Sequence, residues 1–214
     1  KAAKYAATAD RLVKTIRAVQ PSSSFLLHSA AHAVNAGVFA NASHADLARL
    51  FASDFNDSTS ICSLSPFNTF FIVQALANMG YFEHAIAAVH RCWEPMTRLG
   101  QGCFWELFDP EWEAVMTHSG AKAPSRPSYC HPWSSGATAF LSRFLLGVEP
   151  ITPGFLTVSV TPFVSAAYPS TGGAYPVNMG TGTVELNASF VAGDTATADV
   201  RIVMRTPCVG ATVG

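Results

Sequence analysis

The hydrophobic pattern of this chain changes once along its length, and the change limits the folds open to it. From the start to Val148, apolar residues recur mostly at helical spacing, as in Ala2–Val19. Later segments alternate apolar and polar residues, which is typical of half-buried strands: Phe155–Thr161, Thr183–Phe190 and Ala196–Met204. This order predicts an α+β multidomain chain, with helices in residues 1–150 and an antiparallel β domain in residues 151–214.

The helical part contains one strongly marked pair of helices. Ser65 followed by Pro66 is a capping residue before a proline at the first helical position, which predicts a helix over Phe67–Met79. Gly80 should end this helix, and Phe82–Trp93 follows after almost no loop. Because so short a connection forces antiparallel neighbours, we expect an αα-hairpin. Further helices are predicted at Phe25–Val38, His44–Phe55 and Ala137–Val148.

Charge and hydropathy exclude two classes of partner. The net charge is −1 and the basic residues form no stripe, so the chain lacks the electrostatic footprint of a nucleic-acid-binding protein. No apolar run reaches the ~18–20 residues that a membrane-spanning helix needs. Charged residues make up only 13% of the sequence, against roughly 25% in an ordinary soluble domain. A surface with so few charges favours contact with other protein.

The metal-binding residue types form no recognisable motif. The five cysteines are scattered and include no C-x-x-C pair, which argues against a zinc site and against a disulfide framework. We therefore expect free thiols, and leave open a single bridge between Cys103 and Cys130. His28 and His32 have a ligand-like spacing but lack both an intervening glutamate and a third ligand, so we predict a structural role. No metal and no cofactor is predicted.

The sequence gives weak signals about cellular location. Three sequons, at Asn41, Asn56 and Asn187, would permit N-glycosylation in a secretory compartment, although a chain rich in Ser and Thr produces such triplets by chance. The chain begins at Lys1 without a signal peptide, which favours a trimmed or processed fragment. We leave the localisation open.

The stretch from Glu94 to Pro132 loses helical spacing and is too long for an idle connection. Within it, Glu106 stands between aromatic residues, which would partly shield its carboxylate from water and suit it to acid–base chemistry. His131 and Trp133 precede small residues that open a helix, and together they could form a wall of a polar pocket. The alternatives are that Glu106 is an ordinary surface carboxylate and that His131 is a core histidine.

Taken together, several blocks of this sequence resemble the α-L-rhamnosidases of glycoside hydrolase family 78. Their order and spacing carry the resemblance, which is strongest between Ser65 and Pro162. The blocks are Phe67–Gly80, Ala85–Trp93, Phe104–Glu106, Cys130–Gly136, Phe140–Val148 and Pro150–Phe155. Gly102 and Cys103 stand where the family usually has small hydroxyl residues, and Pro132 stands where it has glycine.

The resemblance implies an (α/α)6 toroid of paired helices, present here only in its second half, followed by a C-terminal antiparallel β-sandwich. It also implies an inverting glycosidase that hydrolyses terminal α-L-rhamnosyl linkages. Glu106 matches the catalytic base, and His131 matches a histidine that contacts the sugar. Trp105 and Trp133 are the candidate aromatic residues of the sugar-binding wall. The family's general acid lies in the first half of the toroid, and its motif does not occur here.

These expectations imply specific partners and leave two rival functions. The partners are a rhamnoside and, for the exposed helical edge, either a missing N-terminal portion or a second copy of the chain. The isolated chain should be inactive, because it lacks the general acid. The rivals are a non-catalytic carbohydrate-binding remnant and a structural or interaction domain. A longer protein with an acidic motif upstream of Lys1 would favour the enzyme.

Overall fold

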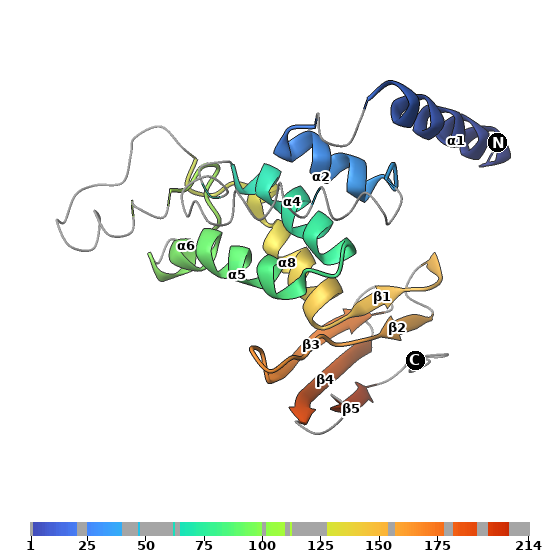
Figure 1. The fold of residues 1–214 in the computed structure, drawn as a ribbon. Coiled ribbons are helices and arrows are strands. Elements are labelled where there is room, and N and C mark those ends of the chain that lie inside the picture. The colour runs from blue at the N-terminus through green and yellow to red at the C-terminus, as the bar shows by residue number, and fades with distance from the viewer. Residues whose placement is uncertain are drawn as a thin grey trace. The chain divides into compact units, whose positions relative to one another are not determined.

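A computed structural model describes residues 2–20, 25–39, 47, 62, 65–99, 102–109, 112, 128–153, 157–177, 182–191 and 197–205. The chain consists of two compact units, Lys1–Gly136 and Ala137–Gly214 (Figure 1). The boundary between the two units lies at the start of the predicted helix Ala137–Val148. The change in hydrophobic pattern predicted a domain boundary at residue 150. The first unit contains most of the helices, and the second contains every described strand.

The first unit begins with two helices that differ in burial. Helix α1 covers Ala2–Val19, as predicted, and none of its residues is buried. Helix α2 covers Leu27–Asn35, a shorter span than the predicted Phe25–Val38, and buries four residues on one side: Ala30, Ala31, Ala33 and Val34. The side chain of Arg17 on α1 donates a hydrogen bond to the carbonyl of Val38. The predicted helix His44–Phe55 lies outside the described residues, apart from Leu47.

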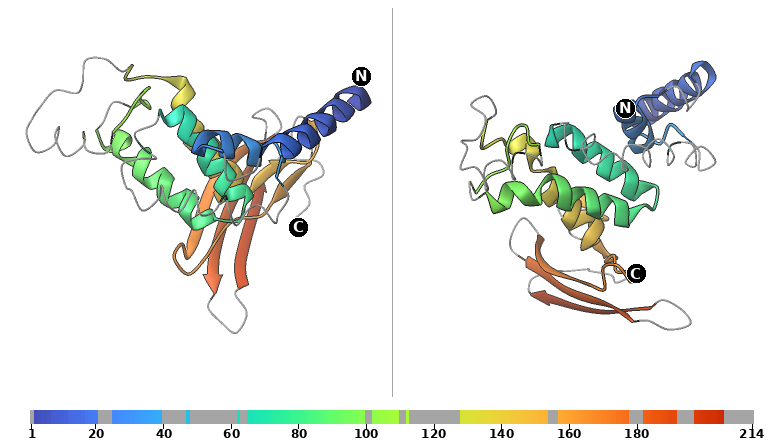
Figure 2. Two further views of the ribbon diagram at one scale, coloured as in Figure 1. Left: turned by 45° about the horizontal axis from the view of Figure 1, so that its top comes forward. Right: turned by 60° about the vertical axis from the view of Figure 1, so that its left-hand side comes forward.

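The predicted αα-hairpin is confirmed. Helix α4 covers Pro66–Asn78, and the Ser65 hydroxyl caps it by accepting a hydrogen bond from the backbone N–H of Asn68 at 3.4 Å. Gly80 ends the helix with a φ of +86°, in the left-handed region that glycine adopts without a steric penalty. Helix α5, Phe82–Cys92, then turns back along α4 (Figure 2). Helix α4 also packs against α2, so it lies in the middle of this unit.

Two short helical segments interrupt the stretch that was predicted to be irregular. Helix α6 covers Glu94–Arg98, and η3, Pro132–Ser134, is a single 3-10 turn. On α6, the carboxylate of Glu94 receives a hydrogen bond from His90 at 2.9 Å and lies 2.7 Å from Arg98. The hydrogen bond from His90 and the charge of Arg98 lower the pKa of Glu94. These contacts hold Glu94 on the surface of α6.

The expectation of free thiols is wrong for four of the five cysteines. Cys62 is bonded to Cys92 at the end of α5, and Cys103 is bonded to Cys130, the pair that the sequence left open. The sequence argument failed because the partners lie 30 and 27 residues apart and only the fold brings them together. Cys208 lies outside the described residues.

The second unit contains a short helix and two antiparallel sheets. Helix α8, Gly136–Phe140, continues as the π-helical turn η4, Leu141–Leu145. Strand β1, Val148–Pro150, pairs with β2, Val158–Val160. A three-stranded sheet follows in the order β3, β4, β5, formed by Ser170–Val177, Gly182–Val191 and Thr197–Arg205.

The second unit corrects two predictions. The helix expected over Ala137–Val148 ends at Leu145, because Gly147 has a φ of +66° and Val148 begins a strand. A Cβ atom on Gly147 would lie 1.9 Å from the Thr161 carbonyl oxygen, so this approach of the chain requires glycine. The loop expected over Ser165–Gly182 contains strand β3. The strand pairing of β4 and β5 agrees with the predicted alternation.

No described helix is both long and apolar enough to cross a membrane. Within the described ranges, no three His, Cys, Asp or Glu side chains gather in the way that would hold a metal ion.

Candidate functional site

The site residues predicted from the sequence come from two segments that pair through their backbones. The N–H of Glu106 donates to the carbonyl of Ser128 at 2.8 Å, and the N–H of His131 donates to the carbonyl of Phe104 at 2.8 Å. Phe104 pairs with His131 and Glu106 with Ser128, so the residue numbers run in opposite directions along the two segments. The segments are therefore antiparallel. Segments 102–109 and 128–131 therefore lie side by side, although more than 20 residues separate Glu106 from His131.

A disulfide bond joins the same two segments. The Cα atoms of Cys103 and Cys130 lie 4.9 Å apart. Cys130 immediately precedes His131, and the bonded Cys103 precedes Phe104, whose carbonyl accepts from His131. Covalent and hydrogen bonds thus restrain the two segments at neighbouring positions.

Glu106 is half-buried at this junction. Its Oε2 atom accepts a hydrogen bond from the backbone N–H of Ser128 at 3.2 Å, which links the carboxylate to the segment that contains His131. The Ser128 hydroxyl donates to the carbonyl of Cys130 at 3.1 Å, so the same segment is also bonded internally. A carboxylate held by a backbone donor has a defined orientation, which a general base requires.

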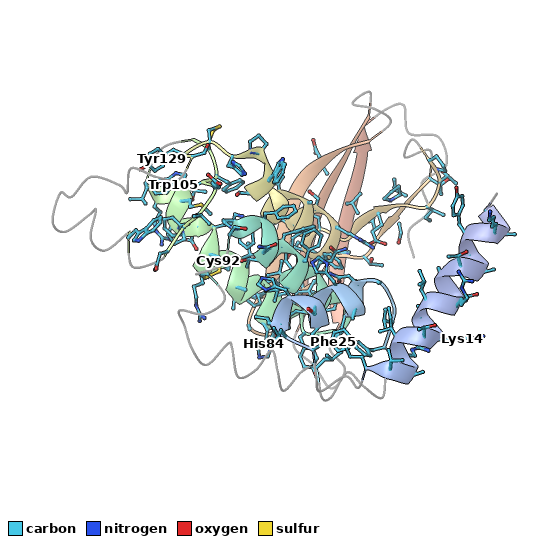
Figure 3. All side chains as sticks on the ribbon, turned by 90° about the horizontal axis from the view of Figure 1, so that it is seen from above. Lys14, Phe25, His84, Cys92, Trp105 and Tyr129 are labelled. Atoms are coloured by element: carbon cyan, nitrogen blue, oxygen red, sulfur yellow. A yellow bond between two sulfur atoms is a disulfide. The ribbon has the colours of Figure 1, made fainter. Side chains whose placement is uncertain are left out.

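Trp105 lies below the site rather than on its surface. Its side chain is fully buried, and its ring makes edge contacts with Phe108 and with Tyr129 at centroid distances of 5.5 and 4.7 Å (Figure 3). Its backbone N–H donates to the sulfur of Met96 at 3.3 Å. Within the described part of the chain, the indole Nε1 has no hydrogen-bond partner. In this structure, the ring packs between the two segments and is closed to a ligand.

Trp133, in contrast, is the exposed aromatic residue of the site. Its side chain is 69% exposed, and its ring lies 5.7 Å from the ring of His131 and 5.5 Å from that of Phe67. The indole N–H of Trp93 donates to the carbonyl of Ser134 at 2.7 Å, which anchors the turn that presents Trp133. His131, Trp133 and Phe67 therefore form a continuous aromatic surface.

Sequence reasoning missed Phe67 as part of this surface. Phe67 is 38% exposed. The available signal was Pro66, which begins α4 and so places Phe67 in its first turn, close to the residues of the site. Nearby, Gly136 packs closely against Phe70, since a Cβ atom on Gly136 would lie 2.5 Å from the Phe70 side chain.

A small cavity of about 180 Å³ lies beside the site, lined by Thr97, Gly102, Cys103 and Phe104. It is smaller than the ~300–1,000 Å³ of typical ligand pockets. Glu106, His131 and Trp133 do not line it. This cavity is therefore separate from the candidate site residues.

His28 and His32 lie on helix α2 in the same unit. The ring of His32 lies 4.7 Å from the ring of Phe71. His28 Nε2 is buried, without a hydrogen-bond partner in the described part of the chain. Burial and, to a smaller extent, the charge of His32 lower the pKa of His28. The arrangement favours a neutral His28.

Three solved structures have a similar fold. They are a GH78 family rhamnosidase from Bacillus sp. GL1 (22% identity, TM-score 0.68), the native α-L-rhamnosidase from Aspergillus terreus (14%, 0.71) and the α-L-rhamnosidase from Streptomyces avermitilis complexed with L-rhamnose (17%, 0.65). The matches cover 100%, 99% and 88% of this chain but only 23%, 25% and 19% of those proteins. The predicted resemblance to α-L-rhamnosidases is thus confirmed at the level of the fold.

Sequence comparison adds no further relatives. No family model matches the chain, and no curated protein matches it significantly. The chain spans about a quarter or less of the length of the solved structures it resembles.

Proposed function

We propose that this chain forms one wall of the active site of a glycoside hydrolase that removes terminal α-L-rhamnosyl groups with inversion of configuration. The observation that carries the proposal is the backbone pairing of the Glu106 and His131 segments within a fold shared with three rhamnosidases. The complete architecture in this proposal is an (α/α)6 toroid, of which residues 1–150 supply the second half, followed by a β-sandwich in residues 151–214.

In the proposed mechanism, Glu106 is the general base. Its carboxylate removes a proton from a water molecule, which attacks the anomeric carbon from the face opposite the leaving oxygen. A second carboxyl group, ~6.5–9.5 Å away to leave room for that water, protonates the leaving oxygen. By the family resemblance this general acid belongs to the first half of the toroid, so another part of the protein must supply it. No cofactor enters the reaction.

The other site residues have binding and supporting roles in this proposal. His131 donates or accepts a hydrogen bond at a sugar hydroxyl, and Trp133 offers an exposed ring face to the apolar side of the sugar. Trp105 acts from beneath, since its buried ring packs against Phe108 and Tyr129 and supports the loop that holds Glu106.

The binding part of the proposal can be tested on the chain itself. We expect the chain to bind L-rhamnose weakly, in the millimolar range that corresponds to ~4 kcal/mol. Trp133→Ala should weaken this binding by about threefold to tenfold, because an aromatic contact contributes ~0.5–1.5 kcal/mol. Ligand-observed NMR titration measures both values.

Leu26→Ala is the matched control, because Leu26 is a large apolar residue of similar exposure, 79% against 69%, at the start of helix α2. This variant should bind L-rhamnose as the unchanged chain does. An unchanged affinity in Trp133→Ala would remove Trp133 from the site. Binding without turnover, even in a protein that holds a general acid, would favour the carbohydrate-binding remnant.

The exposed face of helix α1 supports the rival structural or interaction function. Tyr5, Leu12 and Val19 recur every seven residues, lie on one side of the helix, and are 71%, 54% and 74% exposed. An apolar stripe of this kind marks an interface. We propose that it pairs with a second copy of the chain or with an N-terminal portion of a longer protein.

The first of these partners leads to a prediction about the chain in solution. We expect it to self-associate, with an apparent mass above 22.7 kDa in size-exclusion chromatography with light scattering. Replacing Tyr5 by Ser and Leu12 by Gln should lower that mass by removing the apolar stripe. Lys14→Gln is the control, because Lys14 lies two residues from Leu12 on another side of α1. A monomeric unchanged chain would contradict self-association.

A further inference from the structure

We infer that the Cys103–Cys130 disulfide is a positioning element, which holds the Glu106 carboxylate in register with His131. The inference rests on the proposed function for the roles of these two residues. It rests on the geometry for the restraint itself, because the bond joins the two segments of the site directly.

Three hydrogen bonds among the described residues hold this register. They are two backbone bonds of 2.8 Å and a longer bond of 3.2 Å from the N–H of Ser128 to the Glu106 carboxylate. Each of them crosses between the same two segments. If the segments separate, all three break together, and the carboxylate loses the donor that orients it.

Packing fixes segment 102–109 to a neighbouring helix. Trp105 is fully buried, and its backbone N–H bonds to the sulfur of Met96, so segment 102–109 is fixed to α6. In segment 128–131, Ser128 and Cys130 are exposed, and the ring of Tyr129 makes an edge contact with Trp105. The disulfide therefore ties the more exposed segment, which leads into His131, to the buried one.

The second disulfide provides a matched control. Cys62–Cys92 closes a similar span, 30 residues against 27, and ends on α5. Neither of its cysteines belongs to segments 102–109 or 128–131. A general loss of stability on reduction would follow from either bond, whereas a loss of register at Glu106 should follow from Cys103–Cys130 alone.

Reduction can be applied to one bond at a time. A dithiol reductant supplies two electrons and two protons to the S–S bond, giving two thiols, and is itself oxidised to a disulfide. In Cys62→Ser/Cys92→Ser/Cys208→Ser only the Cys103–Cys130 bond remains, and in Cys103→Ser/Cys130→Ser/Cys208→Ser only the Cys62–Cys92 bond remains.

The experiment compares amide hydrogen exchange by NMR before and after reduction. In the first variant, we expect reduction to speed exchange at the Glu106 and His131 amides by at least about tenfold and to weaken L-rhamnose binding. The exchange rate of the Met79 amide, which is bonded to Ala75 in α4, should not change. Reoxidation should restore the slow exchange of the Glu106 and His131 amides. In the second variant, reduction should leave the ratio of the Glu106 amide exchange rate to the Met79 amide exchange rate unchanged.

Unchanged exchange at Glu106 and His131 after reduction of Cys103–Cys130 would overturn the inference. An equal response to reduction of either bond would also overturn it, because the effect would then be one of general stability. If the first variant does not fold, partial reduction of the unchanged chain, assigned by mass spectrometry, gives the same comparison. The exchange rates could also respond as expected although the chain does not bind L-rhamnose. That result would support the restraint by the disulfide and contradict the proposed function.

Discussion

The 214-residue chain by itself should hydrolyse an aryl α-L-rhamnoside no faster than a chain in which Glu106 is replaced by Gln. Losing a general acid typically costs ~10²–10⁴ in rate, and losing half of a cleft also removes the groups that position the substrate. Release of the aryl alcohol, followed spectrophotometrically, measures both chains. Glu106→Gln also serves as the control for contaminating glycosidase, which would affect both preparations equally.

Turnover that depends on Glu106 in the isolated chain would contradict this prediction. It would place a general acid within the chain, and the nearest candidates in sequence are Asp109, Glu111 and Glu113. Only Asp109 of these lies in the described part. Their replacement by amides, one at a time, would then identify the acid.

Local signals in the sequence predicted the helices well. Helix α1 has the predicted bounds, and α4 begins and ends where its cap, proline and glycine indicate. These signals act within one or two turns, so they do not depend on the rest of the fold. Helix α2 is shorter than expected, because apolar spacing alone does not mark a helix end.

The errors arose where distant parts of the chain determine the local structure. Strand β3 is rich in Gly, Ser and Pro and reads as a loop, but it forms a strand because β4 pairs along its whole length. Gly147 ends a helix because the chain at Thr161 approaches it closely. Both disulfides join residues that only the fold brings together. No window of neighbouring residues contains this information.

The candidate site was predicted in part for the same reason. The motif positions of Glu106 and His131 identified two segments, and the structure pairs them through Phe104 and Ser128. Burial was harder to predict, since the tryptophans of the two motifs differ in exposure: Trp105 is closed to solvent and Trp133 is 69% exposed. The catalytic and binding roles of these residues stay predictions.

Glu106→Gln should have its largest effect in a protein that contains this chain together with a general acid. There we expect kcat to fall by ~10²–10⁴, the usual contribution of a positioned base, while L-rhamnose binding changes little. Glutamine keeps the shape of the side chain and an oxygen that can accept from Ser128, but it cannot take a proton from water. Steady-state kinetics and a binding titration separate the two effects.

Glu94→Gln is the matched control for this loss, because Glu94 is an exposed carboxylate in contact with His90 and Arg98 on α5 and α6. An exposed ion pair of this kind contributes little to stability, so turnover should stay close to that of the unchanged protein. If Glu106→Gln kept a kcat within tenfold of the unchanged protein, Glu106 could not be the base. The half-buried carboxylate and its bond to Ser128 would then serve the loop's structure, and a carbohydrate-binding role without catalysis would explain the same surface better.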